Sequence, residues 1–217
     1  MGPDIRNRGG KAKRGLETEP HAIRFVNTVA WRLGESPEER LSSAEALCEW
    51  LGANGIGDKK AIEELSEVWR RRPTEGAAFY EMAIRFREAI YDILVAKMRG
   101  IEPLQPTLAL FNDFLTSPRP GLHLEWDGNA LVWRMRDARA SPFDLLGPIA
   151  FSASELMTGI KAGKVRQCED DRGCGWLFVD ESRAQRRRWC SMGDCGNRAK
   201  ARRHYQRARK RPDEDGP

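Results

Sequence analysis

The sequence predicts an α+β protein: a mainly helical N-terminal domain with a small β-hairpin, followed by a compact cysteine-rich module that ends in a basic helix. Three observations lead to this class. Apolar residues recur at three- and four-residue steps over most of residues 21–158. Residues 121–136 instead alternate with period two around Asp127-Gly128. Four of the five cysteines stand between residues 168 and 195.

Length and the distribution of charge indicate how the chain is divided into parts. It has 217 residues and a formal net charge of +5, yet residues 161–211 hold sixteen Lys and Arg against six Asp and Glu. This segregation is typical of a polyanion-binding module attached to a roughly neutral domain. We expect four parts: a disordered basic tail (1–20), a helical domain (21–160), the cysteine module (161–211) and an acidic tail (212–217).

No apolar run approaches the ~20 residues of a membrane span, and the first residues resemble neither a signal peptide nor a lipidation signal. We therefore expect no membrane association and a cytoplasmic protein. The sequence does not indicate an oligomeric state.

Helical periodicity and start and stop residues locate the helices. Ser42 or Ser43 and Asp58 are candidate N-caps, Pro73 is expected to end a helix, and Gly100 follows the longest one. The predicted helices span 21–34, 44–52, 59–72, 75–99, 107–115 and 142–158.

Glycines 159 and 163 mark the predicted joint between the two parts of the chain. Because the N-terminal helices have their own apolar stripes, we expect a chain ending near Gly163 to fold alone.

Two residues of the helical domain stand out by type. Asn27 is polar on an otherwise apolar helix, which fits either a ligand pocket or a side chain that satisfies nearby backbone groups. Cys48 lies among apolar neighbours and is interpreted as a small buried hydrophobe rather than a ligand or nucleophile.

The remaining cysteines are spaced as metal ligands. Cys168 and Cys174 form a C-x5-C pair, and Cys190 and Cys195 follow as C-x4-C after fifteen intervening residues. Two thiolate pairs can close a tetrahedral shell around one Zn²⁺, with no coordination position open for catalysis. Two disulfides are the alternative, but the odd cysteine count argues against them. A knuckle, a short strand over 175–180 and a last ligand at a helix start make this a treble-clef-like four-cysteine zinc module.

The module is strongly basic near its second cysteine pair. Between Arg198 and Arg211, eight of fourteen residues are Arg or Lys and none is acidic. Arginine pairs bidentately with phosphates and guanine edges, and a helix fits the major groove of DNA. The candidate nucleic-acid contacts are Arg183, Arg186, Arg187, Arg188, Lys200, Arg202, Arg203, Arg207 and Lys210. Arg198 is instead expected to offset the charge of the zinc–thiolate centre, and Trp189 to cover it.

Other functions remain open at this point. RNA competes with DNA as the partner, although aromatic residues for stacking are few in the module. A treble-clef metallo-enzyme would need a His or carboxylate set around an open metal, and His204 is the only histidine of the module. An acidic protein partner is the third alternative. The residues thus favour a non-enzymatic binding protein.

Two signatures in this sequence resemble known families. Residues 186–192, RRRWCSM, and 195–198, CGNR, resemble the CGNR zinc-finger family of bacterial proteins. Residues 25–32, FVNTVAWR, and 85–94, RFREAIYDIL, are similar to the ABATE domain found with it, although acids common in that family are replaced by Arg24 and Ala30. The resemblance implies a zinc-dependent DNA-binding transcription regulator whose N-terminal domain senses a small-molecule effector. It leaves the effector and its binding residues unspecified.

Overall fold

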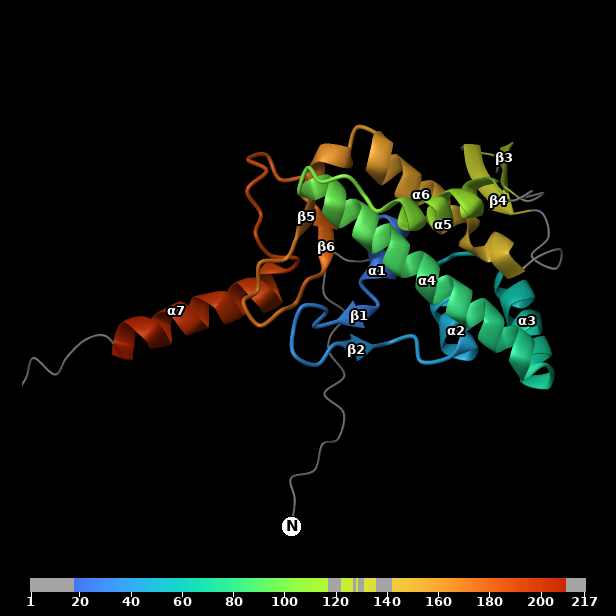
Figure 1. Ribbon diagram of the computed structural model, residues 1–217, viewed down its shortest axis with the longest axis horizontal. Coiled ribbons are helices and arrows are strands. Elements are labelled where there is room, and N and C mark those ends of the chain that lie inside the picture. The colour runs from blue at the N-terminus through green and yellow to red at the C-terminus, as the bar shows by residue number, and fades with distance from the viewer. Residues whose placement is uncertain (1–17, 117–121, 127, 129–130, 136–141, 210–217) are drawn as a thin grey trace, which may run out of the picture.

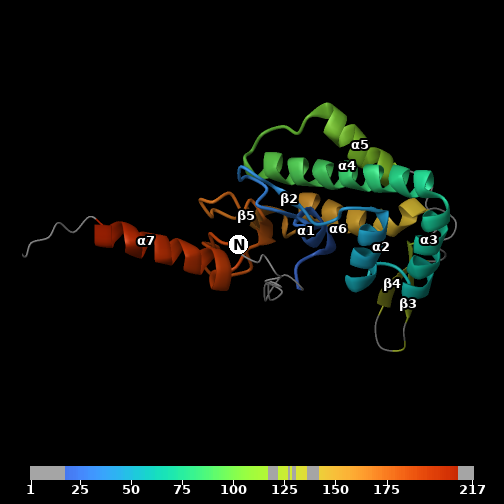
Figure 2. The same cartoon turned by 90° about the horizontal axis from the view of Figure 1, so that it is seen from below.

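The structure is a computed structural model that describes residues 18–116, 122–126, 128, 131–135 and 142–209. Of the predicted tails, only residues 18–20 belong to this range, and residues 1–17 and 212–217 lie outside it. A helical body occupies one end of the molecule, and a helix projects from the other end (Figures 1 and 2). The fold class predicted from the sequence is confirmed: helices predominate, the sheets are two-stranded, and four cysteines lie together ahead of a final helix.

The centre of the body is α4 (Pro73–Met98), with α1 (His21–Val26), α5 (Gln105–Thr116) and α6 (Gly147–Thr158) packed against it. The apolar stripe of α4 supplies this packing. Its Phe86 is fully buried and lies 4.0 Å and 5.7 Å, between ring centroids, from Phe114 and Phe111 of α5. The preceding helix ends at Arg71, just before Pro73 as predicted, and Pro73 also begins α4, because the first helical position needs no backbone N–H donor.

Two shorter helices, α2 (Ala44–Ala53) and α3 (Lys59–Arg71), pack near the N-terminal end of α4. Their starts follow the predicted caps. The Ser43 hydroxyl accepts from the backbone N–H of Ala46 at 3.2 Å, and the Asp58 carboxylate accepts from that of Ala61 at 3.0 Å. Each cap satisfies one backbone donor that a helix end leaves free.

The predicted hairpin is present as β3 (Leu122–Trp126) paired antiparallel with β4 (Leu131–Met135). Gly128 lies in the connection with φ of +101°, a conformation that favours glycine. The helix expected over 142–158 begins as a 3-10 turn, η1 (Pro142–Leu146), before α6.

The first helix is shorter than its apolar periodicity predicts. α1 ends at Val26, and the chain continues as β1 (Val29–Ala30), which pairs antiparallel with β2 (Glu38–Glu39). Trp31 then adopts a positive φ of 53°, which ends any extension of the helix. The cause is tertiary, because the Asn27 side chain bonds to a strand that lies 150 residues further along the chain.

That strand belongs to a hairpin that is built into the body. β5 (Val165–Gln167) follows the short 3-10 turn η2 (Ala162–Lys164) and pairs antiparallel with β6 (Leu177–Val179). Val165, Leu177 and Val179 are buried in the same apolar cluster as the body helices. Three side chains of this hairpin therefore contribute to the core of the body helices, and independent folding of a chain ending near Gly163 stays a prediction to be tested. We call residues 165–209 the zinc segment below.

The last helix has the opposite surroundings. α7 (Asn197–Arg209) extends away from the body in both views (Figures 1 and 2), and Ala201 and Tyr205 are exposed rather than packed inward. Within the described residues, no helix is long and apolar enough to cross a membrane.

Candidate metal centre and nucleic-acid interface

Four cysteine sulfur atoms lie close together within the zinc segment. Cys168, Cys174, Cys190 and Cys195 are all buried, and their Sγ atoms lie within 4.8 Å of one another. The separations are 3.8 Å from Cys174 to Cys190 and 3.6 Å from Cys190 to Cys195. A tetrahedron with Zn–S bonds of about 2.3 Å has S···S edges of about 3.8 Å. The sulfurs are thus already spaced for one four-coordinate zinc ion.

The first sulfur pair is held by a knuckle between β5 and β6. The N–H of Cys168 donates to the Trp176 carbonyl at 2.8 Å, and Cys174 stands between two glycines with positive φ, Gly173 and Gly175. A Cβ at Gly173 would lie 2.3 Å from the backbone nitrogen of Gly34. Glycine is required there both for the turn and for the close approach of the body.

The second pair lies at the start of α7. Ser191 caps a turn of π-helix, η3 (Met192–Gly196), by accepting from the N–H of Asp194 at 3.3 Å. Cys195 lies in this turn, and α7 begins two residues later. The turn couples the direction of α7 to the position of the sulfur cluster.

Arg198 lies beside the sulfurs, as the sequence led us to expect. Its guanidinium donates to Cys195 Sγ at 2.8 Å and to the buried carboxylate of Asp170 at 2.8 and 3.1 Å. Burial is the largest influence on Asp170 and raises its pKa, but the bond and charge of Arg198, with the bonds from the Arg172 N–H and Cys195, together hold that pKa below its usual value. Four thiolates and Zn²⁺ carry a net charge of −2, which this cation offsets.

The fifth cysteine lies elsewhere. Cys48 is buried on α2 within the core of the body, and burial raises the pKa of its thiol to about 12. A thiol that stays protonated is neither a ligand nor a nucleophile at neutral pH.

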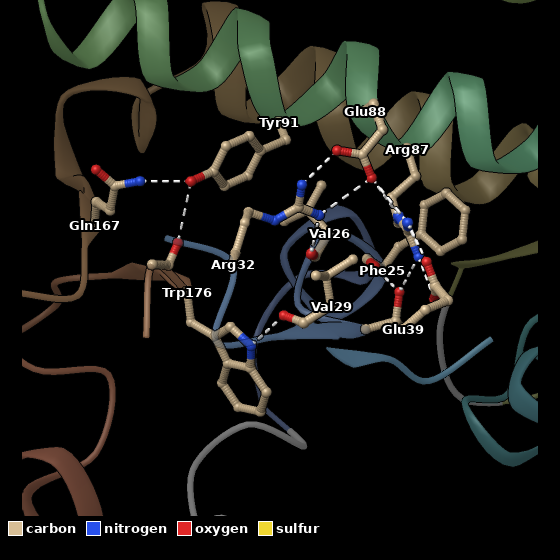
Figure 3. Close-up of polar contacts among 12 residues, drawn as sticks. Phe25, Val26, Val29, Arg32, Glu39, Arg87, Glu88, Tyr91, Gln167 and Trp176 are labelled. Carbon is tan, nitrogen blue, oxygen red and sulfur yellow. Dashed lines mark hydrogen bonds and ion pairs between the residues drawn. The ribbon is translucent and has the colours of Figure 1, made fainter. Parts of the chain in front are cut away.

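A layer of polar contacts joins the metal centre to the body. Asn27 pairs with both backbone groups of Leu177: its Nδ2 donates to the carbonyl at 2.8 Å and its Oδ1 accepts from the N–H at 2.9 Å. The Trp176 indole donates to the Val29 carbonyl at 2.7 Å, as Figure 3 shows. The sequence left two roles open for Asn27, and the structure shows it satisfying buried backbone groups.

Beside this layer, charged side chains of the body form a network that sequence reasoning missed. Arg87, which is 2% exposed, donates to Glu39 at 2.6 and 2.7 Å and to Glu88 at 2.8 Å (Figure 3). Glu88 also accepts from Arg32. One signal was present in the sequence, since Arg87 falls on the apolar stripe of α4 between Phe86 and Ile90.

The same network reaches the zinc segment through α4. The Tyr91 hydroxyl accepts from the Gln167 side chain at 2.6 Å and donates to the Gly175 carbonyl at 3.3 Å (Figure 3). The guanidinium of Arg32 lies 4.1 Å from the centre of the Tyr91 ring. These contacts therefore hold the knuckle and the β1–β2 turn in fixed positions relative to α4.

The predicted nucleic-acid contacts fall into two groups. In the first group, Arg188 pairs with Glu169 and Arg202 with Asp171 of the knuckle. The acid between these two, Asp170, pairs with Arg198, which was predicted to serve the zinc centre instead. Arg187 donates to the carbonyls of Trp189 and Cys190, and its guanidinium lies 4.5 Å from the Phe178 ring centre.

The second group is exposed. Among the described side chains, Arg183, Arg186 and Lys200 reach solvent without an ion pair, and Arg203 bonds only to the Ala199 carbonyl of its own helix while lying near Trp189. Arg207 lies within α7, and Lys210 lies outside the described residues. Trp189 packs against the sulfur cluster, in agreement with a covering role.

The fold and the site together define a four-cysteine zinc-finger protein with a helical N-terminal body. A family model described as ABATE, a putative stress-induced transcription regulator, matches residues 19–160, and one described as the CGNR zinc finger matches residues 164–208. The chain belongs to the ABATE family and carries a CGNR zinc finger with one structural zinc ion. Neither description is that of an enzyme. None of the curated proteins matches the chain.

Proposed function

We propose that the protein is a zinc-dependent DNA-binding transcription regulator that uses α7 and the 183–188 turn as its DNA interface. The observation that carries this proposal is α7, which projects from the body (Figure 1) and whose Lys200 and Arg203 side chains are exposed. Apart from the ion pairs of Arg198 and Arg202 with the knuckle, the helix has no acid in its own sequence to offset its basic side chains. A polyanion supplies the missing counter-charge, and the description of the matched family agrees with a regulator.

Within this interface, we assign different roles to different basic residues. Arg183, Arg186 and Lys200 are proposed to contact phosphates, because they are exposed and carry no ion pair among the described residues. Arg203 is proposed to reach base edges from the first turns of α7. Arg187 supports the fold of the segment instead, since its side chain bonds to two carbonyls.

The knuckle acids limit non-specific binding in this proposal. Glu169 and Asp171 hold two arginines of the interface in ion pairs. A bound phosphate must compete with these carboxylates and is repelled by them. Binding therefore depends more on the few free cations and on base contacts than the total charge of the segment indicates.

Zinc acts as a structural centre and takes no part in a reaction. Its four thiolate ligands leave no position for substrate, and among the described residues the four cysteines are the one cluster able to hold a metal. The metal would hold the 183–188 turn and the start of α7 at one fixed spacing. We also propose that the helical body senses a small molecule and that the protein acts at the nucleoid in the cytoplasm.

Fluorescence anisotropy of the zinc-loaded chain on duplex DNA and on hairpin RNA of equal length, across a salt series, tests the proposal. We expect duplex DNA to bind with an affinity that falls steeply with salt, by about 0.9 log units per log unit for each phosphate neutralised. Arg186→Ala and Lys200→Ala should each lower that slope by roughly one unit.

Arg71→Ala is the matched control, because that arginine lies on α3 and pairs with Glu67 in the body. It should leave the slope unchanged. Binding that does not respond to salt, or binding to the RNA alone, would refute the DNA-binding proposal.

A further inference from the structure

A pocket of about 450 Å³ lies where the helical body meets the zinc segment. Its lining comes from α1 and the residues just after it, the chain after β2, α2, and Trp176 just before β6. The side chains that define its chemistry are Arg24, Asn27, Arg40, Glu49, Trp50 and Trp176. Pockets of about 300–1,000 Å³ with aromatic walls and a few polar groups are the usual form of small-molecule sites.

The aromatic walls of this pocket are held in place before any ligand binds. Trp176 is 4% exposed, and its indole N–H is committed to the Val29 carbonyl at 2.7 Å. The Trp50 ring packs on Phe25 with centroids 5.4 Å apart. The Trp50 ring, which is half-buried, offers a flat apolar surface of fixed orientation that a planar ligand meets at low entropic cost, whereas the buried Trp176 contributes only a small exposed part to the lining.

The charged residues of the lining favour an anion. Arg40 places its guanidinium 5.1 Å from the centre of the Trp176 ring, while its contact with Glu38 is long, at 3.9 Å. Arg24 adds a second guanidinium, and Glu49 is the single acid on the described lining. A guanidinium matches a carboxylate bidentately, so the Arg40 side chain suits one carboxylate.

We propose that this pocket binds a small planar aromatic monocarboxylate. The ring would lie against Trp50, and the carboxylate would pair with the guanidinium of Arg40, which lies beside Trp176. This deepens the proposed sensing function by giving it a site and a ligand class, and only its regulatory meaning rests on that function.

The site is placed to affect the metal centre. The Trp176 carbonyl accepts from the N–H of Cys168, and Asn27, also on the lining, pairs with both backbone groups of Leu177. A ligand that contacts these two side chains stabilises the hairpin carrying Cys168 and Cys174. Bound ligand should therefore slow the release of zinc to a chelator.

Calorimetric titration of the zinc-loaded full chain with benzoate, compared with the neutral benzyl alcohol, tests the site. We expect benzoate to bind at least about tenfold more tightly than the alcohol, and Arg40→Gln to weaken benzoate by at least about tenfold through loss of a charge-assisted pair. Arg71→Gln, an exposed arginine on α3, should bind as the parent chain does. Absence of benzoate binding up to about 10 mM, or equal affinity for acid and alcohol, overturns the proposal.

Two further measurements test benzoate binding without relying on any single variant. Saturation-transfer NMR on the unaltered chain should show the benzoate ring receiving magnetisation from the protein, and zinc release to a chromogenic chelator should slow with benzoate but not with benzyl alcohol. Unchanged release rates would refute the link to the metal centre.

Anisotropy on duplex DNA with and without benzoate then separates the two proposals. DNA binding without benzoate binding overturns the pocket alone. Benzoate binding by a chain that ignores DNA leaves the pocket standing and overturns the regulator.

Discussion

The helical body and the zinc segment reach stability by different means. Fully buried apolar side chains such as Phe25, Phe86 and Ile90 fill the body. The interior of the zinc segment consists of four cysteines with Trp176 and Phe178, too little apolar surface to offset the entropy of ordering the chain. The body should therefore respond mainly to denaturant and the segment mainly to a chelator. The helical body and the zinc segment depend on each other at the hairpin β5–β6, whose side chains are buried in the body core.

Loss of zinc should have the largest effect on this comparison. Structural zinc binding contributes on the order of 10 kcal/mol to small thiolate sites, so Cys190→Ser should lose its metal and the order of the segment beyond β6. Metal analysis and the near-UV circular dichroism of Trp189 and its neighbours measure this. Cys48→Ser is the matched control and should retain one zinc per chain, because Cys48 lies in the body core. Zinc retained without Cys190 would contradict the ligand set.

Truncation after Gly163 breaks the dependence of the body on the segment. It removes Val165, Leu177 and Val179 from the core, at about 1.5–3 kcal/mol each, against a total stability of about 5–15 kcal/mol. We expect a helical but poorly packed product, with dispersed amide signals lost in NMR spectra. A sharp, cooperative thermal transition of the truncated chain would show that the body is independent after all.

Asn27→Ala tests the polar contact between the two regions. It leaves the N–H and C=O of Leu177 buried without a partner, at a cost of about 2–5 kcal/mol. Urea unfolding measures this cost, and zinc affinity should fall with it. Asn54→Ala removes only a bond to the Trp50 carbonyl at the end of α2 and should cost about 1 kcal/mol or less. Equal effects of the two variants would argue against a special role for Asn27.

Adjacent arginines sharpen the comparison between structure and interface. Arg187→Ala removes two bonds to carbonyl groups and should lower the free energy of unfolding by about 1–3 kcal/mol. Arg186→Ala removes an exposed side chain and should change the melting temperature little while lowering the salt dependence of DNA binding. Differential scanning calorimetry and anisotropy separate the two. The reverse pattern would exchange the proposed roles.

The smallest predicted effect concerns pH and the network on α4. Burial is the largest influence on Glu88 and raises its pKa, but the bonds and charges of Arg32 and Arg87 together outweigh it, so the pKa lies below the ordinary 4.5. The resulting stability is present above pH 4.5 and is lost as the pH falls through the lowered value. Because Glu88 is 39% exposed, solvent screening keeps the effect to about 1 kcal/mol or less.

Glu88→Gln should therefore be less stable at neutral pH and lose less on acidification, measured by urea midpoints between about pH 7 and about pH 3. Glu81→Gln, on the exposed face of α4, should follow the parent chain. Identical pH profiles for Glu88→Gln and the parent would contradict a stabilising ion pair.

Local chemistry in the sequence was enough to predict the zinc ligands as a group, the Ser43 and Asp58 caps, the hairpin around Gly128 and the basic terminal helix. Each depends on residues close in sequence whose spacing or type restricts the backbone directly. The apolar period also placed the longest helix within two residues of its observed start.

Contacts between distant residues decided the rest, and no local pattern encodes them. The bond of Asn27 to Leu177 accompanies the early end of α1, and Val165 and Val179 of the predicted zinc module are buried in the core of the helical body. Ion pairs with three successive acids decide which arginines of a uniformly basic sequence stay free. A residue type fixes which interactions a side chain can make, but burial and neighbours in space determine which ones it does make.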